Sequence, residues 1–146
     1  MINIGGRGGS SGMQSRSLKS PLNPFPDSLI QDTVFHGTNV SNITEFNTRG
    51  EQSNGAIFFA SDEEDAEIHG SNKPGQQYIY EVNLDIRNPL RVENKTHWGD
   101  PEIEGRYIRY AKISGNDSVV FSDGYGEFFY AVFSPEQVKI RNVKKG

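Results

Sequence analysis

The segment QYIYEVNLDI, residues 77–86, constrains the fold more than any other part of this sequence. Side chains along a β-strand point alternately to the two faces of a sheet, so every second residue shares a face. One face of this segment is wholly apolar or aromatic, and the other is mixed. The apolar face would carry Tyr78, Tyr80, Val82, Leu84 and Ile86. The pattern predicts a strand against a hydrophobic core, ending at Asn88-Pro89.

Other short apolar runs predict further strands, and two segments favour helices. Ser61-Asp62-Glu63-Glu64 fits a capping box and predicts a helix that runs to about His69 and stops at Gly70. Residues 101–113 could form a second helix, which Gly105 would weaken. The expected strands are TVFH (33–36), GAIFFA (55–60), SVVFS (118–122), FFYAVFS (128–134) and QVKIRNV (137–143). We therefore expect an α+β fold in which strands dominate.

Residues 1–31 differ in composition from the rest of the chain. The stretch MINIGGRGGSSGMQSRS is rich in Gly and Ser, and PLNPFPDSL follows with its prolines close together. Such a segment buries too little apolar surface to offset the entropy of ordering it. We expect residues 1–31 to be a flexible arm, which is either a native linker or an added sequence scar. The folded domain would then span 32–146.

Charge and composition argue against several classes of protein. The formal net charge of −4 disfavours general nucleic-acid binding. The chain has no cysteine for a disulfide framework or a thiolate metal site. No metal-binding motif, phosphate-binding loop, secretory signal or membrane-spanning apolar run is recognisable. We expect no metal, no membrane partner and a cytoplasmic location, or a host cytoplasm or virion if the source is a phage.

Three blocks of the sequence occur in an order similar to that of a known family. They are FHGT (35–38), GAIFFASDEEDAEIHG (55–70) and EFFYAVFSPEQVKI (127–140). Together they resemble the ADP-ribosyltransferase fold of the diphtheria-toxin and poly-ADP-ribose polymerase type, whose triad is His-Tyr-Glu. The likeness covers roughly residues 33–143 and looks closest to small members found in phage and prophage proteins. It implies split antiparallel β-sheets with a flanking helix, and NAD as co-substrate.

The resemblance also implies residues that hold NAD. His36 would hydrogen-bond a ribose hydroxyl, and the backbone of Gly37 would pair with the nicotinamide amide, since a residue without Cβ admits a ligand close to the chain. The hydroxyl of Thr38 could reach a ribose or its own turn. Phe58 stands where the family has the first ring of an aromatic clamp, and it keeps the stacking face without the hydroxyl. His69 stands where the family has the second ring.

The catalytic glutamate of the family aligns with Phe129, which cannot act as an acid. Glu127 lies two residues earlier and would share the same strand face, so we expect Glu127 to be the catalytic residue. Its charge would stabilise the cationic sugar as nicotinamide leaves. Glu136, beyond a proline in a turn, is a poorer candidate. Arg49 could contact the NAD pyrophosphate, although a solvated surface arginine is the commoner role.

These assignments predict a mono-ADP-ribosyltransferase, a toxin-like effector that moves ADP-ribose from NAD to a macromolecule, most simply a protein. The alternative is a non-catalytic module of the same fold on a phage structural protein. Phe129 favours the module, and FHGT with the helix block favours the enzyme. A nuclease using His36 and His69 finds no supporting basic groove. Residues 122–126 could recognise the target or form a tight hairpin turn.

Overall fold

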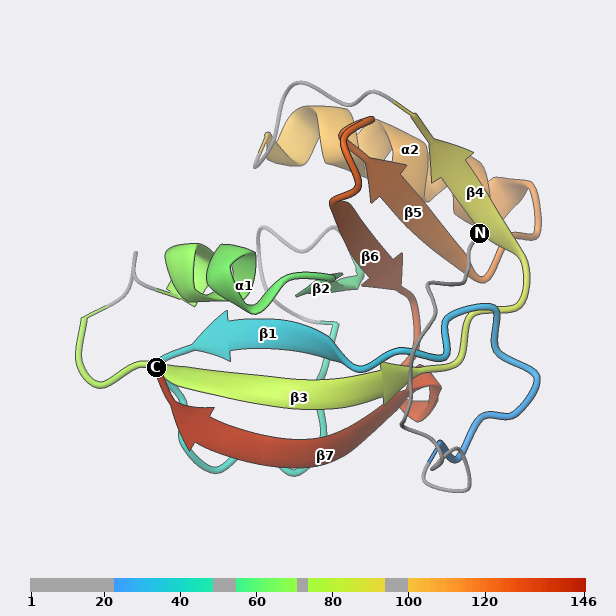
Figure 1. The fold of residues 1–146 in the computed structure, drawn as a ribbon. Coiled ribbons are helices and arrows are strands. Elements are labelled where there is room, and N and C mark those ends of the chain that lie inside the picture. Colours follow the sequence, from blue (N-terminus) through green and yellow to red (C-terminus); the bar gives the residue numbers. More distant parts are fainter. Residues whose placement is uncertain (1–22, 49–54, 71–73, 94–99) are drawn as a thin grey trace.

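The computed structural model describes residues 23–48, 55–70, 74–93 and 100–146 (Figure 1). In these ranges, strands and two helices alternate in an α+β arrangement, which confirms the expected class. The strands are β1 (Val34–Thr38), β2 (Ile57–Ala60), β3 (Tyr78–Leu84), β4 (Pro89–Val92), β5 (Ser118–Ser122), β6 (Phe128–Val132) and β7 (Val138–Lys145). The helices are α1 (Glu63–Gly70) and α2 (Pro101–Ile113), and a 3-10 turn covers Pro135–Gln137.

The strands form one sheet in the order β4-β5-β6-β2-β1-β3-β7. One residue pair, Phe35 with Ala60, joins β1 to β2, whereas five pairs join β1 to β3 and four join β2 to β6. Figure 1 shows β1, β3 and β7 as one half and β4, β5 and β6 as another half that turns away from it. The expected split of the sheet lies at this thin junction between β1 and β2.

One strand, β4, was not expected, and it makes the sheet mixed rather than purely antiparallel. Asn88-Pro89 was interpreted as the end of a strand, but Pro89 is the first residue of β4, which runs parallel to β5. A proline is tolerated there because β4 is an edge strand, where a missing N–H breaks no ladder on the open side. Among the described residues, five of the six neighbouring strand pairs are therefore antiparallel, and one pair, β4 with β5, is parallel.

The helix α2 forms despite its internal glycine. Asp100 caps its start and accepts hydrogen bonds from the backbone N–H of Glu102 at 3.0 Å and Ile103 at 3.4 Å. Pro101 follows at a position where a proline favours helix initiation. Gly105 is buried on the side that faces the sheet, so it lies in the packed interface rather than interrupting the helix.

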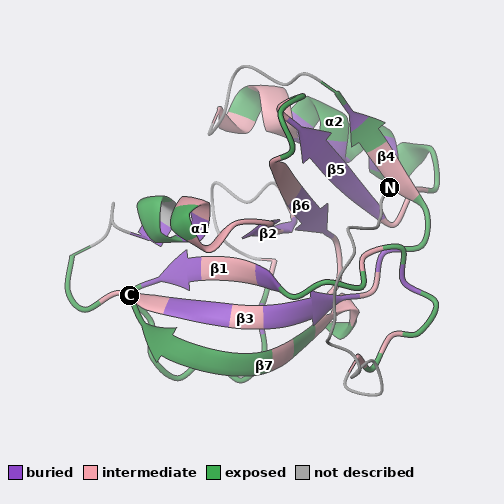
Figure 2. Cartoon of the chain, viewed as in Figure 1, coloured by how far each residue is buried: buried purple, intermediate pink, exposed green. Residues whose placement is uncertain are grey.

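Both faces of the sheet are covered, by different parts of the chain. The face that carries Tyr80 packs against residues from the segment between β1 and β2, notably Phe46 and Ile43. The opposite face is covered by α1 over β1 and by α2 over β5. Figure 2 shows most of β3 and β5 buried and β7 largely exposed. The predicted apolar face of β3 is confirmed, since its main hydrophobic cluster contains Tyr80, Val82, Leu84 and Ile86.

Residues 23–31 pack on the domain, although they fall within the expected arm. The Ser28 hydroxyl donates to the carbonyl of Leu84 at 2.6 Å and accepts from the N–H of Ile86 at 2.9 Å. The N–H of Leu29 donates to the carbonyl of Ile86 at 2.7 Å, and Ile30 packs against the core. This segment continues the hydrogen bonding past the end of β3, so a boundary at residue 31 would cut through packed structure. Residues 1–22 lie outside the described ranges.

Replacing Ser28 by alanine is expected to lower the free energy of unfolding by about 1–3 kcal/mol, the usual cost of leaving buried backbone groups without their partner. Ser28 is 6% exposed, so water cannot replace its hydroxyl. Urea unfolding of the variant measures the loss, with Ser41→Ala at an exposed position as the control. Equal stability of Ser28→Ala and Ser41→Ala would show that the hydrogen bonds of the Ser28 hydroxyl contribute nothing to the stability of the domain.

Candidate functional site

His36 lies where β1 and β2 part. Its Nδ1 lies 2.7 Å from the carbonyl oxygen of Phe58. Because a carbonyl only accepts, Nδ1 carries the proton of this hydrogen bond. The ring also packs edge-on against Phe46, with centroids 4.9 Å apart, and against Phe59 at 5.5 Å. His36 therefore links the two halves of the sheet through its side chain, close to the one residue pair that joins their backbones.

Gly37 is enclosed by the backbone of α1. A Cβ on this residue would lie 1.9 Å from the carbonyl oxygen of Ala66 and 3.2 Å from the backbone nitrogen of Gly70. The side chain is absent for a packing reason, because the helix that follows β2 crosses β1 at this residue. The sequence did not indicate this reason. The neighbouring Thr38 is 4% exposed, and its hydroxyl accepts from the N–H of Val40 at 3.4 Å, within its own turn.

The aromatic residues of β2 divide between the two faces of the sheet, as the alternation predicts. Phe59 belongs to the cluster around Tyr80, whereas Phe58 is half-buried and packs on the side covered by α2. Phe129 of β6 also lies on that second side, where it contacts the clusters beneath both helices. Phe129, which the resemblance aligns with the family's glutamate, is therefore a packing residue.

Glu127 stands just before β6, on the same side as Phe129. Its backbone is held by Asp123, whose carboxylate accepts from the Glu127 N–H at 3.2 Å. Its carboxylate meets Asp62 and Asp65 at the start of α1, and ligand atoms of the three groups all lie within 4.8 Å of one another. Burial is the largest cause that raises the pKa of Glu127. The charge of Asp65 and a hydrogen bond with Asp65 raise this pKa further, and so do the charges of Asp62 and Asp123.

We call Asp62, Asp65 and Glu127 the acidic triad. The two aspartates were not among the predicted site residues, because their position in the sequence indicated only ordinary acids at a helix start. A usable signal was present: the two aspartates are three residues apart where the sequence predicts a helix, a spacing that places side chains on one helix face, and they directly follow the strand that pairs with β6. Three carboxylates so arranged offer the oxygen ligands that Mg²⁺ and Ca²⁺ prefer, although acidic groups also gather at surfaces without an ion.

The start of α1 differs in detail from the capping-box interpretation. The helix begins at Glu63, and the Ser61 hydroxyl accepts from the N–H of Phe128 at 2.9 Å. The N–H of Ser61 donates to the carbonyl of Phe128, also at 2.9 Å. Ser61 therefore extends the pairing of β2 with β6 by one residue, which brings the helix start, and with it the acidic triad, beside β6.

The expected site residues do not all share one face. His36 leaves the sheet on the face of Phe59 and Tyr80, whereas Glu127 leaves it on the face of Phe58 and Phe129. The structure thus brings Phe58 and the backbone of Gly37 onto the side of the acidic triad and directs the His36 ring to the other side.

Two expected NAD contacts cannot be placed. Arg49 lies outside the described residues, and His69 is part of α1 but its side chain is not described. Within the ranges that the structure describes, no helix is long and apolar enough to cross a membrane.

A known structure shares this arrangement of strands and helices. A chain in the crystal structure of the M. tuberculosis MbcT–MbcA toxin–antitoxin complex aligns with a TM-score of 0.52 at 9% identity, covering 79% of this chain and 84% of that chain. At this identity the likeness shows the fold alone. An anti-CRISPR protein aligns with a TM-score of 0.43 at 17% identity, covering 78% of this chain and 94% of that one, which is too distant for an argument. The comparison with curated proteins finds no match.

A family model gives the more specific result. Residues 32–146 match the model of a family described as "ADP-Ribosyltransferase in polyvalent proteins". The match covers most of the chain and contains β1, β2, α1, β6 and the acidic triad.

Proposed function

Because this chain belongs to the ADP-ribosyltransferase family of polyvalent proteins, we propose that it is a mono-ADP-ribosyltransferase. It would move ADP-ribose from NAD to a macromolecular target, most simply a protein, and release nicotinamide. The observation that best supports this proposal is the position of Glu127, whose half-buried carboxylate lies on the same side of the sheet as Phe58 and the α1-covered backbone of Gly37.

The reaction needs a fixed negative charge more than it needs a proton donor. The bond between C1′ of the ribose and the nicotinamide nitrogen breaks, and its electron pair leaves with nicotinamide. A lone pair of the acceptor then forms the new bond to C1′, and the acceptor releases its proton. Positive charge builds up on the sugar between these events. The carboxylate of Glu127, together with those of Asp62 and Asp65, would stabilise that charge. The half-buried ring of Phe58 would offer a stacking surface for the nicotinamide.

The alternative of a non-catalytic module has its own support. Phe129 replaces the acid of the family pattern and is packed beneath both helices. The His36 ring is engaged with the carbonyl of Phe58 on the opposite face from Glu127. A module that keeps the fold for binding, on a phage structural protein or elsewhere, would need neither residue for chemistry.

Release of nicotinamide distinguishes the two functions. The protein is incubated with NAD labelled in the nicotinamide ring, with and without an extract of bacterial proteins, and free nicotinamide is measured. A second incubation with NAD labelled in the adenylate follows transfer of label to protein or nucleic acid, which also identifies the class of target. Release with transfer supports the transferase, whereas NAD binding without release supports the module. A protein that neither binds NAD nor releases nicotinamide would contradict the transferase.

The raised pKa of Glu127 predicts how the rate depends on pH. Only the ionised carboxylate can stabilise the cationic sugar, so activity should fall as pH drops through the Glu127 pKa. Because that pKa is raised, the fall should begin at a higher pH than for an ordinary glutamate of pKa about 4.3. Asp65→Asn removes a neighbouring charge and should move the acidic limb of the profile to lower pH.

The control for this prediction is Glu136→Gln, at an exposed glutamate whose pKa is lowered by its hydrogen bond with Ser134. It should leave the pH profile of nicotinamide release unchanged. An acidic limb at the same pH in the wild type and in Asp65→Asn would mean that Glu127 is not the group whose ionisation controls the rate.

A further inference from the structure

The hairpin that joins β5 to β6 is closed by the side chain of Asp123. The two strands pair as far as Ser122 with Phe128, and one step further the N–H of Asp123 donates to the carbonyl of Glu127 at 3.2 Å. In an ordinary hydrogen-bonded antiparallel pair, the return bond would run from the N–H of Glu127 to the carbonyl of Asp123. Here it runs to Oδ1 of the Asp123 side chain, also at 3.2 Å. The carboxylate thus takes the place of a backbone carbonyl in the last step of the ladder.

The same carboxylate oxygen holds a second backbone group of the hairpin. Oδ1 of Asp123 accepts from the N–H of Tyr125 at 2.7 Å. Gly124 and Gly126, on either side of Tyr125, have φ angles of 83° and 98°, which glycine adopts without strain. The chain can therefore curl around the carboxylate, and one side chain fixes both the tip of the hairpin and the residue that precedes β6.

The backbone is also fixed on the other side of Glu127. The next residue, Phe128, exchanges two hydrogen bonds of 2.9 Å with Ser61, between β2 and α1. Asp123 therefore supports Glu127 from the hairpin, and Ser61 supports it from the start of the helix. Between these two supports, the carboxylate of Glu127 lies against the two aspartates of the acidic triad.

We propose that Asp123 is a positioning residue for Glu127, whose backbone it holds so that the Glu127 carboxylate meets the reacting sugar in one fixed orientation. This inference rests on the proposed function, because it takes Glu127 as the group that stabilises the cationic ribose. Misplacing a group by about 1 Å can cost about 10²-fold in rate. Without the Asp123 carboxylate, the backbone of Glu127 is held from the Ser61 side and loses its support from the hairpin.

Asp123 acts on Glu127 through position rather than through charge. Burial is the largest cause of the raised pKa of Glu127, and the charge of Asp65, the hydrogen bond with Asp65 and the charge of Asp62 all come before the charge of Asp123. Asparagine at position 123 keeps an acceptor oxygen and loses the charge, whereas alanine loses both. The two substitutions therefore separate the two roles.

The full chain is compared with Asp123→Asn and Asp123→Ala at a pH on the plateau of the wild-type rate profile. Two quantities are measured, the kcat of nicotinamide release and the calorimetric affinity for NAD. Asp123→Ala should lower kcat by about 10–10²-fold and leave the affinity unchanged, because the carboxylate of Glu127 acts on a charge that develops only in the transition state. Asp123→Asn should keep a kcat close to that of the wild type.

Amide hydrogen exchange gives a second readout, which does not depend on activity. The N–H groups of Tyr125 and Glu127 both donate to Asp123. In Asp123→Ala these two amides should exchange about tenfold faster or more, since each loses a hydrogen bond to a charged group. In Asp123→Asn they should keep most of their protection.

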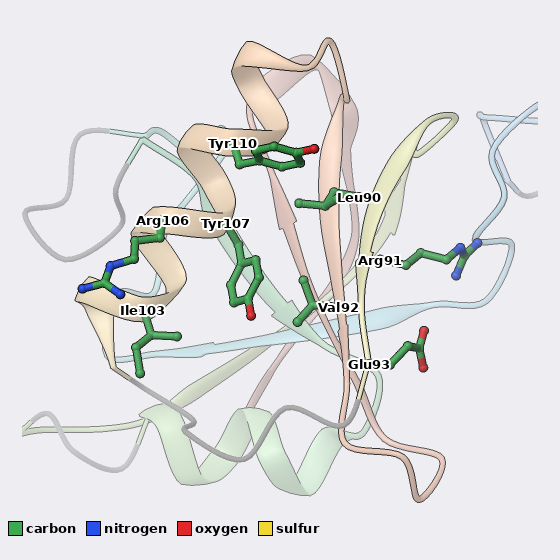
Figure 3. Close-up of a pocket in the computed structure, with 8 residues that line it drawn as sticks. All are labelled: Leu90, Arg91, Val92, Glu93, Ile103, Arg106, Tyr107 and Tyr110. Atoms are coloured by element: carbon green, nitrogen blue, oxygen red, sulfur yellow. The ribbon is translucent and has the colours of Figure 1, made fainter.

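Asp100→Ala is the matched control, because Asp100 also accepts from two backbone N–H groups, those of Glu102 and Ile103. Asp100 caps α2, whose side chains Ile103, Tyr107 and Tyr110 line an open groove against β4 (Figure 3). This groove shares no residue with the acidic triad or with the β5–β6 hairpin. Asp100→Ala should lower the melting temperature through loss of the cap and leave kcat unchanged.

The outcomes separate failure of this role from failure of the proposed function. An active wild type with an equally active Asp123→Ala variant overturns the positioning role and leaves the transferase standing. An Asp123→Asn variant as slow as Asp123→Ala would make the charge decisive and equally overturn it. So would an Asp100→Ala variant that slows release as much, since general loss of stability would then explain the effect. A wild type that releases no nicotinamide contradicts the transferase itself, and the role of Asp123 falls with it.

Discussion

Replacing Glu127 by glutamine is expected to lower the rate of nicotinamide release by about 10²–10³-fold, the scale seen when one charge-stabilising group is removed from an active site. Glutamine keeps the size of the side chain and one acceptor oxygen but loses the charge. The affinity for NAD should change little, because the carboxylate interacts with a charge that exists only as the bond to nicotinamide breaks. Nicotinamide release and calorimetric NAD binding, measured side by side, check both halves of this expectation.

Glu136→Gln is the matched control, since it makes the same chemical change at an exposed residue in the 3-10 turn after β6. It should leave both quantities at the wild-type value. An active wild type with an equally active Glu127→Gln variant would remove Glu127 from the mechanism. A wild type that binds NAD without releasing nicotinamide would instead indicate that the chain has lost its catalytic acid at Phe129, and would favour the binding module.

Replacing Gly37 by alanine is expected to destabilise the fold by about 3 kcal/mol or more, at the upper end of what overpacking costs. The new methyl group would lie 1.9 Å from the carbonyl oxygen of Ala66. That atom belongs to the backbone of α1, which cannot rotate aside as a flexible side chain could. The helix would have to move off β1, which carries the largest share of its contacts with the sheet. Urea unfolding monitored by circular dichroism measures the loss.

Gly146→Ala is a suitable control, because a Cβ there makes only ordinary van der Waals contacts, the nearest at 3.4 Å. It should be as stable as the wild type. If Gly37→Ala were also as stable, the close packing of α1 on β1 would be disproved, and the glycine would be left with the ligand role that the family resemblance implies.

The sequence predicted the elements whose signals are local. The alternation in 77–86 gave β3 and its buried face correctly, because side chains on a strand follow a period of two regardless of what surrounds them. Residues 101–113 were expected as a possible helix weakened by Gly105, and the helix forms over these residues, with its cap, Asp100, next to it in sequence. The class of fold followed from the order of these elements.

The parts that were missed depend on contacts between distant segments. Pro89 looked like the end of a strand because nothing local shows that β4 would lie at an edge, beside β5. The hydroxyl of Ser61 bonds to Phe128, a partner that only the pairing of β2 with β6 brings near. The acidic triad likewise joins residues that are far apart in the chain. Gly37 was correctly singled out, but its enclosing neighbour, α1, is a fact of packing rather than of sequence pattern.

The thin junction between β1 and β2 has a consequence for how the chain can fold. The half made of β1, β3 and β7 and the half made of the other strands are interleaved, because the chain passes between them at β1–β2, β2–β3, β3–β4 and β6–β7. Neither half is a continuous stretch of sequence. Tyr78 of β3 pairs with Lys145 of β7, so one half stays incomplete until β7 leaves the ribosome. Folding dominated by such distant pairings is slow, and we expect this domain to reach its native state only after the whole of β7 has been synthesised.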